Sequence, residues 1–325
     1  MARVVFLLVP QLHLLDLAGP AQVFSAAADL GHDYQLHYVA ERNQVPSVQG
    51  VPLVADTAWP ELTPDDLVVV PGWRPRAHPP HGPVGVDDLR RLAAHHASGG
   101  TVASVCAGAY ALGRAGLLDG RRCTTHHEVQ DDLARRHPAA RVVRDVLYVV
   151  DDRVVTSAGI ASGIDVALHL VATRHGPAAA AAIARTMVVY ARRNGHEQQA
   201  SAMMRYRSHL SDAVHRVQDL IDSRFAEPLP LAELAAAGGV AERTLTRLFR
   251  RTTGLTPLGY QQLLRVERAE HLIGHGTTMD AAARTVGFTD ARMLRRLRAR
   301  DARVPRHAGS SRPGSGTPPA ATRAG

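Results

Sequence analysis

The feature that most limits the possible folds is an abrupt change of pattern near residue 210. Before it, short apolar runs rich in valine and leucine alternate with helical stretches, and after it only helical patterns remain. Strands that are apolar along their whole length and separated by helices are typical of a parallel sheet covered on both faces. The sequence therefore predicts a flavodoxin-like α/β domain, with a mainly parallel sheet and flanking helices, followed by an all-α domain.

The same pattern predicts four segments along the chain. The first domain is expected to span 1–190 and to close with an alanine-rich helix. A polar segment, 191–210, is expected to link it to a helical domain over 211–305. The last residues, 306–325, are rich in Gly, Ser, Pro and Ala and carry almost no core residues, which predicts disorder.

Composition excludes several classes of protein. No apolar run reaches the ~18 residues that a membrane-spanning helix needs, and the apolar start, interrupted by Asp16, is expected to be a buried strand rather than a signal peptide. The two cysteines form no CxxC pair, which argues against a disulfide framework or a structural zinc site. Phosphate-binding glycine motifs are absent, and the neighbouring side chains of His95–His96 and His126–His127 should point apart. We therefore expect a cytoplasmic protein without a cofactor or a metal.

Positive charge is concentrated in the second part of the chain. All 38 basic residues are arginines. Residues 1–200 hold 18 of them against 19 acidic residues, whereas residues 201–325 hold 20 against 11. Only the second part is therefore expected to meet a polyanion. A solvated basic surface is the alternative that composition alone leaves open.

The helical domain contains a rough internal repeat. Its two copies, LAELAAAGGVAERTLTRLFRRTTG (231–254) and MDAAARTVGFTDARMLRRLRARDARV (279–304), each contain a short alanine-rich helix, a glycine turn and an arginine-rich helix. This order is the pattern of a helix-turn-helix unit. Two ordinary helical hairpins are the alternative, but the duplication, the connecting helix over 257–274 and the positive charge favour double-stranded DNA as the partner.

Specific motifs add a family resemblance. The segments TLTRLFRRTTGLTP and VGFTDARML resemble the DNA-binding domain of AraC/XylS-type transcription regulators. The segments LLDLAGPAQVF, SVCAGAYALGRAGLLDGRRCTTHH and DDRVVTSAGIASGIDVALHLV resemble the PfpI/ThiJ-like domain, a relative of class I glutamine amidotransferases. The fusion of both is similar to the GlxA-type regulators. This resemblance implies a sequence-specific regulator whose first domain senses a small metabolite and forms a homodimer, and which meets RNA polymerase.

The resemblance also implies how DNA is bound. Two helix-turn-helix units, joined by one long helix, are expected to enter adjacent major grooves, which lie about 34 Å apart. Arginines should contact phosphates while a few side chains read bases. The residues expected at the DNA are Arg243, Thr244, Arg247 and Arg250 in the first unit and Asp290, Ala291, Arg292 and Arg295 in the second.

The second copy departs from the pattern of the family. In the first copy Phe249 is followed by Gly, Pro and Tyr, but Arg298 aligns with Phe249 and no Tyr follows Pro305. An arginine in place of a core aromatic forfeits an anchor worth ~3 kcal/mol. A frayed or weakly specific second unit is therefore expected, and a shifted reading frame near the end is a second explanation.

The stretch SVCAGAYALG places Cys106 at the turn between a strand and a helix. This is the geometry of a nucleophile elbow, and a helix N-terminus behind the thiol is expected to lower its pKa. By the resemblance, Asp16 contacts the thiol and His126 lies nearby. The backbone N–H groups of Gly72 and Ala107 are expected to form an oxyanion hole.

These five residues support three hypotheses: catalysis, ligand contact or redox sensing, and a structural remnant of an enzyme-like fold. A cysteine-dependent hydrolase or hydratase, similar to isocyanide hydratase, would use Cys106, Asp16 and His126 as catalytic residues. Against it, Ala107 stands where those enzymes carry Thr, His127 replaces an aromatic residue, and the domain is fused to a DNA-binding domain. We therefore expect an effector pocket formed by Asp16, Gly72, Cys106, Ala107 and His126, and no enzyme. The second cysteine, Cys123, is expected to be buried rather than reactive.

Overall fold

The protein is described by a computed structural model that covers residues 2–74, 82–189, 193–195, 199, 206–207, 209–274 and 276–301. The chain up to Gln199 forms one compact unit and the chain after it forms a second. The division thus falls inside the segment 191–210. The tail predicted over 306–325 lies outside the described residues.

The first unit is built on a six-stranded sheet with the strand order β2-β1-β5-β6-β10-β9. Its strands are β1 (Ala2–Leu7), β2 (Tyr34–Val39), β5 (Leu67–Val70), β6 (Thr101–Val105), β9 (Tyr148–Asp151) and β10 (Val154–Ser157). All neighbouring strands are parallel except β9 and β10, which pair antiparallel. The predicted mainly parallel sheet is confirmed.

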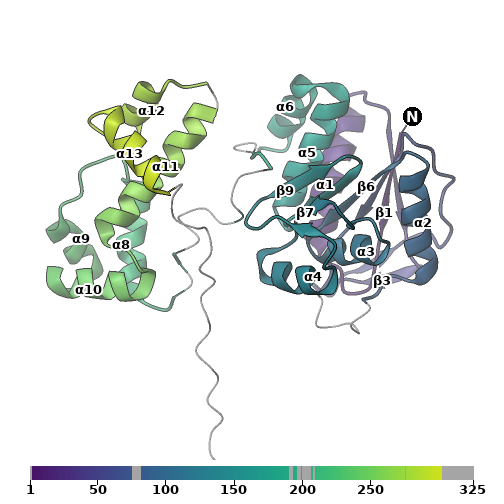
Figure 1. The fold of residues 1–325 in the computed structure, drawn as a ribbon, viewed down its shortest axis with the longest axis horizontal. Helices are drawn as coiled ribbons and strands as arrows, with labels where there is room; N and C mark the ends of the chain where they lie inside the picture. Colours follow the sequence, from purple (N-terminus) through teal and green to yellow (C-terminus); the bar gives the residue numbers. More distant parts are fainter. Residues whose placement is uncertain are drawn as a thin grey trace, which may run out of the picture. The chain divides into compact units, whose positions relative to one another are not determined.

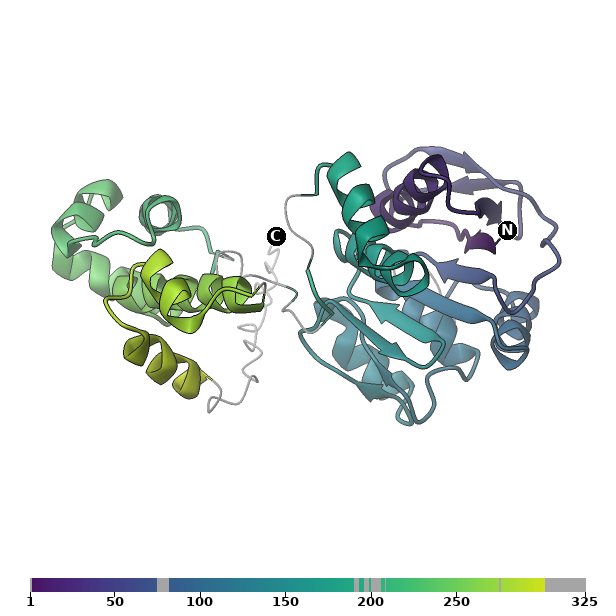
Figure 2. The ribbon, with the colours of Figure 1, turned by 90° about the horizontal axis from the view of Figure 1, so that it is seen from above.

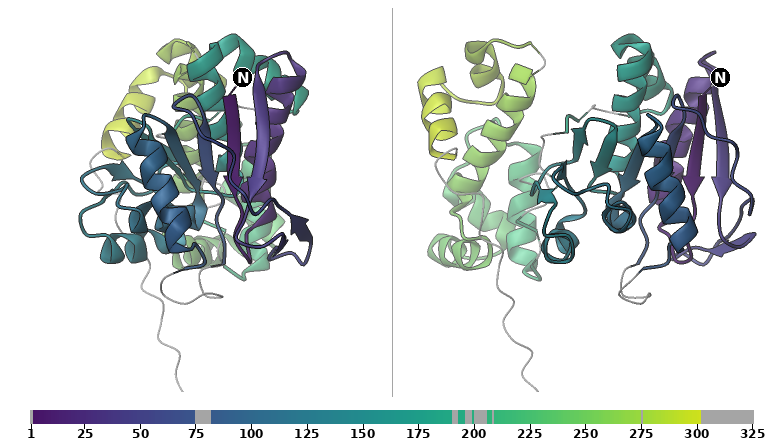
Figure 3. Two further views of the ribbon diagram at one scale, coloured as in Figure 1. Left: turned by 90° about the vertical axis from the view of Figure 1, so that its right-hand side faces the viewer. Right: turned by 45° about the vertical axis from the view of Figure 1, so that its right-hand side comes forward.

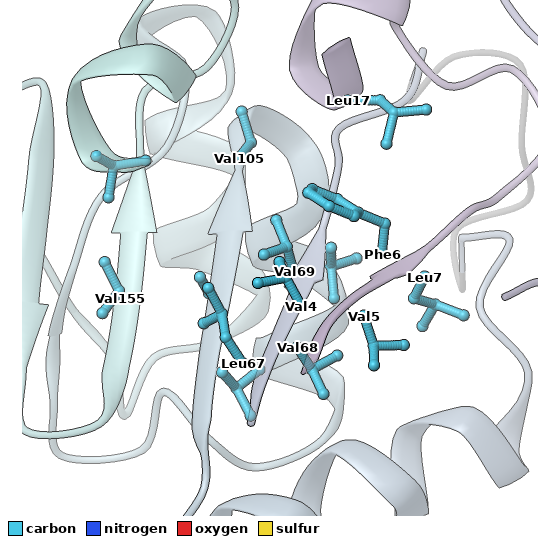
Figure 4. Close-up of a cluster of buried hydrophobic side chains, with 14 of the residues drawn as sticks. Val4, Val5, Phe6, Leu7, Leu17, Leu67, Val68, Val69, Val105 and Val155 are labelled. Carbon is cyan, nitrogen blue, oxygen red and sulfur yellow. The ribbon is translucent and has the colours of Figure 1, made fainter. Parts of the chain in front are cut away.

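Helices cover both faces of this sheet (Figures 1 and 3). On one face, three helices pack on one another: α1 (Leu14–Asp29), α5 (Ser162–His175) and α6 (Pro177–Thr186). The other face carries α2 (Val86–Ala97) and α3 (Ala109–Arg114). Because both faces are covered, β5 and β10 are buried at every position, which explains the uninterrupted apolar sequence of β5. In β10 the buried hydroxyl groups of Thr156 and Ser157 are hydrogen-bonded. Figure 4 shows Phe6, Val69 and Val105, from three neighbouring strands, within the resulting core.

Short elements complete the first unit. Two of them are strand pairs: β3 (Gln44–Pro46) with β4 (Pro52–Val54), and β7 (Arg122–Cys123) with β8 (Arg141–Val142). The others are the 3₁₀ turns η2 (Cys106–Gly108) and η3 (His127–Val129) and the helix α4 (Gln130–Arg136). The strand pairs were not predicted, because two or three residues are too few to show a period of two.

The second unit is all-helical, as predicted (Figures 1 and 2). Its helices are α8 (Asp212–Ser223), α9 (Leu231–Gly238), α10 (Glu242–Thr253), α11 (Pro257–Gly274), α12 (Met279–Thr285) and α13 (Ala291–Asp301). The pairs α9–α10 and α12–α13 form the two helix-turn-helix units. Gly239 and Gly287 lie in the turns of these units with φ of 68° and 85°, a region that favours glycine.

Each helix-turn-helix unit has its own apolar core. The first combines aliphatic residues with two fully buried aromatic side chains, Phe249 and Tyr260, whose rings lie 5.8 Å apart. The second core holds mainly small residues, with Phe288 and Leu294 as its larger members. No helix within the described ranges is long and apolar enough to cross a lipid bilayer.

The substitution of Arg298 for an aromatic residue is accommodated at the edge of the second core. Its Nε lies 3.2 Å from the carboxylate of Glu270 on α11, and its Nη1 contacts the sulfur of Met279. Phe288, which comes from the turn before α13 rather than from α13 itself, places a buried aromatic ring in this core. Helix α13 continues through Asp301, so the expected fraying is not present in the described part of this helix.

Candidate functional site

Cys106 lies on a strained turn directly after β6. Its φ is 54°, in the left-handed region that a residue with a side chain adopts at a cost of about 1–3 kcal/mol. Close backbone approaches hold this turn in place. A Cβ atom at Gly108 would overlap the carbonyl oxygen of Val70, and one at Gly159 would overlap the Cβ atom of Cys106. The predicted strand–turn–helix geometry is therefore present, and glycine is required at both positions.

Asp16 is placed beside Cys106 by the first turn of α1. Its side chain is 0% exposed, and Oδ1 accepts a hydrogen bond of 2.5 Å from the backbone N–H of Ile160. The second oxygen, Oδ2, is buried against Gly72 and Cys106. Burial raises the pKa of Asp16 to about 6, and hydrogen bonds from the Ile160 N–H, the Cys106 thiol and the Gly72 N–H oppose that rise.

The Cys106 thiol does not have the lowered pKa that the elbow predicts. Burial raises its pKa well above the usual value, and the nearby Asp16 carboxylate adds to the rise. The N–H of Ala107 opposes both effects. The prediction was wrong because burial and the neighbouring carboxylate outweigh the N–H groups of the short turn and helix that follow the thiol. A neutral thiol is the form that this site favours.

Gly72 closes the site from the loop after β5. A Cβ atom here would overlap Asp16 Oδ2 and lie 2.6 Å from the Cβ atom of Cys106 and 2.9 Å from the N atom of Ala107. Four of the five residues expected in the pocket, Asp16, Gly72, Cys106 and Ala107, are therefore in direct contact.

His126 lies at the edge of this group. Its Nδ1 accepts a hydrogen bond from the N–H of Glu128 at 3.4 Å, and its ring centroid lies 4.2 Å from that of His127. Burial and the positive charge of His127 lower the pKa of His126. His13, which precedes α1, contributes to this lowering, and Glu128 contributes to the raised pKa of Cys106. The sequence reasoning missed both His13 and Glu128, since neither belongs to a recognisable motif.

A second feature missed by sequence reasoning is a chain of hydrogen bonds that leads away from Cys106. The hydroxyl of Thr125 donates to the carbonyl oxygen of Cys106 at 2.7 Å. The carbonyl oxygen of Thr125 accepts from Gln130 Nε2 at 3.1 Å and from Gln199 Nε2 at 2.9 Å. Gln199 Nε2 also donates to the carbonyl of Val146 at 3.1 Å. The last described residue of the first unit is thus bonded to the backbone beside the site.

Part of the segment predicted as a linker is held by the first unit. Arg193 donates to the buried carboxylate of Asp165 through its backbone N–H at 3.2 Å and its Nη2 at 2.5 Å. The carbonyl of Gly195 accepts from the N–H groups of Leu147 and Tyr148. These described residues therefore form part of the packed unit.

The predicted DNA surface consists largely of exposed side chains. Those of Arg243, Thr244, Arg247 and Arg250 are exposed on α10, and those of Arg292 and Arg295 are exposed on α13. Asp290 precedes α13, and its Oδ1 accepts from the N–H groups of Arg292 and Met293 at 2.7 and 3.1 Å. Ala291 differs from the others because it is buried in the core of the second helix-turn-helix unit.

The remaining candidates for chemistry lie apart from these sites. Cys123 is buried, as expected, and burial together with Asp151 raises its pKa to about 11. The described residues contain no group of three His, Cys, Asp or Glu side chains that could hold a metal ion.

Comparisons with known proteins match both units. The DJ-1/PfpI family matches residues 2–173, and a helix-turn-helix domain matches residues 234–304. The HTH-type transcriptional regulator CdhR of Pseudomonas aeruginosa is 31% identical over 273 residues, which are 82% of this chain and 79% of CdhR. Isonitrile hydratase of Pseudomonas putida is 36% identical over 171 residues, 51% of this chain and 68% of the hydratase.

Solved structures agree on the fold. The crystal structure of a ThiJ/PfpI family protein from Pseudomonas syringae has a TM-score of 0.50 and 22% sequence identity, and the match covers 73% of this chain and 90% of that one. At this identity the likeness concerns the fold alone.

Proposed function

The chain belongs to the DJ-1/PfpI family and is a DNA-binding transcriptional regulator of the GlxA type with an AraC-type helix-turn-helix domain, and from this premise we propose that the Asp16–Cys106 site is its sensor. In this proposal a small molecule binds at the site and changes the affinity of the second unit for its operator. The site binds this molecule reversibly and does not convert it to a product.

The observation that carries the proposal is the strained turn at Cys106, held beside the fully buried carboxyl of Asp16. The left-handed backbone of Cys106 costs about 1–3 kcal/mol, so its retention needs a reason. A ligand that carries an N–H or O–H group and takes the place of the Cys106 thiol as a donor to Asp16 supplies this reason. The carboxyl, the thiol and the backbone of Gly72 are packed together, so such a ligand shifts Cys106 when it binds.

The hydrogen bonds of Thr125 supply a route from the sensor to the rest of the chain. A ligand that shifts Cys106 also shifts the Thr125 hydroxyl, and the Thr125 carbonyl is an acceptor for Gln199. Gln199 lies where the first unit ends. Ligand binding is therefore linked to the path of the chain toward the helix-turn-helix units, and the two binding free energies must be reciprocal.

The proposed regulator acts in the cytoplasm, where its DNA lies, and works as a homodimer in contact with RNA polymerase. Light scattering of the purified chain at micromolar concentration should give twice the monomer mass of 34.9 kDa.

The test uses the full chain and DNA selected by it from a random-sequence pool. A panel of primary amines, amino acids and alcohols is screened by thermal shift, and each binder is then titrated in a DNA-binding assay. We expect a binder to change DNA affinity in the wild type. In Gln199→Ala it should still bind but no longer change DNA affinity, whereas Gln35→Ala, an exposed glutamine on β2, should behave as the wild type. A binder that leaves DNA affinity and oligomeric state unchanged in the wild type contradicts the proposal.

The second candidate function is a cysteine-dependent hydratase. It is favoured by the strained backbone of Cys106 beside Asp16 and by the similarity of the first unit to isonitrile hydratase. The raised pKa of the thiol counts against it, because a thiolate is the nucleophile in such chemistry. An assay of isonitrile hydration decides the matter: turnover by the wild type that Cys106→Ala abolishes would establish the enzyme, and equal rates in both would exclude this use of the site.

A further inference from the structure

Helix α11 is shared by the two helix-turn-helix units, and one arginine lies where the two cores meet. Leu264 belongs to the core of the first helix-turn-helix unit, and Val266 belongs to the core of the second helix-turn-helix unit. Arg265 stands between them in the sequence, on a helix that is continuous from Pro257 to Gly274. Its position makes it the natural place for a contact that joins both units.

The guanidinium group of Arg265 donates hydrogen bonds to both units. On the side of the first helix-turn-helix unit, Nε donates to the carbonyl of Phe225 at 2.6 Å and Nη2 to the carbonyl of Glu227 at 2.9 Å. On the side of the second helix-turn-helix unit, Nη1 donates to the carbonyl of Gly287 at 2.8 Å. The carbon Cζ also lies 5.7 Å from the ring centre of Phe288. One planar group therefore joins the loop before α9 to the turn before α13.

The two segments that Arg265 joins are also in direct contact. Gly287 has a φ of 85°, and a Cβ atom there would overlap the carbonyl oxygen of Ala226. Phe225 packs against both apolar cores. Gln261, one turn earlier on α11, donates to the carbonyls of Phe225 and Glu227, both on the first-unit side. The single side chain of Arg265 thus connects the loop, α11 and the turn through its hydrogen bonds.

We propose that Arg265 is a positioning residue that fixes the rotation and distance between the recognition helices α10 and α13. The protein then binds tightly only to DNA in which the segments contacted by α10 and by α13 are separated by one fixed number of base pairs. Each added base pair moves the second segment by about 3.4 Å and rotates it by roughly 35° around the DNA axis. A rigid connection cannot follow this change, whereas a loose one can. This inference concerns DNA recognition and does not depend on the sensor.

Substitutions at this position separate spacing from affinity. Lysine carries one compact ammonium group and lacks the planar fork of arginine, so it cannot reproduce the three bonds. Methionine retains an unbranched apolar stem, although it is shorter than arginine, and removes all three donors. The matched control is Arg268→Lys, which changes an exposed arginine on the same helix.

The experiment measures binding of the full chain to DNA selected from a random pool by the wild type, with the two contacted segments located by footprinting. Insertion of two base pairs between them should weaken the binding of the wild type at least ~50-fold, because a wrongly placed helix-turn-helix unit loses its base contacts. The same insertion should weaken the binding of Arg265→Met by less than ~5-fold. On the original spacing, Arg265→Met should bind ~10-fold more weakly than the wild type. Arg265→Lys should lie between them, and Arg268→Lys should show the wild-type spacing penalty.

Equal spacing penalties in the wild type and in Arg265→Met would overturn the proposal, as would a wild type that tolerates the insertion. A DNA-free measurement gives a second test, with circular dichroism to confirm that the variants fold. Spin labels at Arg251→Cys and Arg296→Cys, both exposed positions on the two recognition helices, should give one narrow distance distribution in the otherwise wild-type chain. The distribution should broaden in Arg265→Met, and an unchanged width would contradict the role assigned to Arg265.

Discussion

The Asp16–Cys106 site and the arginine surface of α10 and α13 handle charge in opposite ways. In the first, an ionisable carboxyl is fully buried beside a buried thiol, and burial displaces the pKa of both groups. In the second, the arginines are exposed while apolar residues of the same helices form the cores. The buried site should therefore respond to added atoms, protons and small ligands. The exposed surface should respond to salt and to DNA.

The largest effect is expected from adding one methyl group to the buried site. Gly72→Ala would place a Cβ atom within 3 Å of Cys106 and of the Ala107 backbone, and backbone cannot move aside as a flexible side chain can. We expect a loss of about 3 kcal/mol in the free energy of unfolding of the first unit. Chemical denaturation monitored by circular dichroism measures it.

Gly85→Ala provides the matched control, since a Cβ atom there meets nothing within 4 Å. It should change stability by less than about 0.5 kcal/mol. Similar losses in both variants would mean that the Asp16–Cys106 site is not as tightly packed as its distances indicate.

A smaller effect is expected from pH. The pKa of Asp16 is about 6 in the folded protein, above the ordinary aspartate value of 3.8 that applies to the unfolded chain, so folding favours the protonated carboxyl. Its contribution is therefore greatest at low pH and is lost as the pH rises from about 4 through 6. Between pH 5 and pH 7.5 the stability advantage of Asp16→Asn over the wild type should grow by about 1.5 kcal/mol.

The control for this prediction is Asp29→Asn, which removes an exposed carboxyl from the same helix. Its stability relative to the wild type should stay nearly constant across this pH range. If Asp16→Asn also follows the wild type in parallel, Asp16 does not carry the pH dependence.

The two regions also differ in how far the sequence predicts them. Apolar strands reveal the sheet because burial on both faces favours apolar residues, and the repeat reveals the helix-turn-helix units. The turn at Cys106 follows from small residues after a strand. Carbonyl acceptors leave no such trace, since every residue carries one. The bonds of Gln199 to Thr125 and of Arg265 to Gly287 could therefore not be found before the fold was known.

The predicted direction of the Cys106 pKa shift was wrong for a related reason. The elbow motif predicts only the local turn, whereas the pKa of the thiol depends on its burial and on a carboxylate that lies 90 residues earlier in the chain. Arg298 is a similar case, because the alignment with Phe249 shows a lost aromatic ring but not the compensating Glu270. Tertiary neighbours, rather than neighbours in sequence, decide both outcomes.

On the exposed surface, single substitutions should alter DNA binding without altering stability. Arg247→Ala removes one exposed charge from α10. We expect about 5-fold weaker binding to selected DNA and a decrease of about one in the slope of log affinity against log salt. Anisotropy titrations at several salt concentrations measure both, and the melting temperature should not change.

Arg90→Ala tests whether any lost charge would suffice. Arg90 is exposed on α2 and pairs with the exposed Asp87, outside the helix-turn-helix units. Its removal should leave affinity and salt slope at the wild-type values. Equal losses in Arg90→Ala and Arg247→Ala would show that total charge, rather than the surface of α10, governs binding.

The smallest effect is expected at Arg298, which tests the comparison within a single helix. Arg298 and Arg295 both lie on α13, but Arg298 pairs with Glu270 at the edge of the core whereas Arg295 is exposed. The pair is partly exposed, with 37% and 49% of the two side chains accessible, so Arg298→Ala should cost at most about 0.5 kcal/mol in stability. Because its charge faces Glu270, the salt slope of DNA binding should not change, whereas Arg295→Ala should lower it by about one. If the salt slope falls equally in both variants, Arg298 contacts DNA. The distinction between arginines that stabilise the fold and arginines that bind DNA would then not hold on α13.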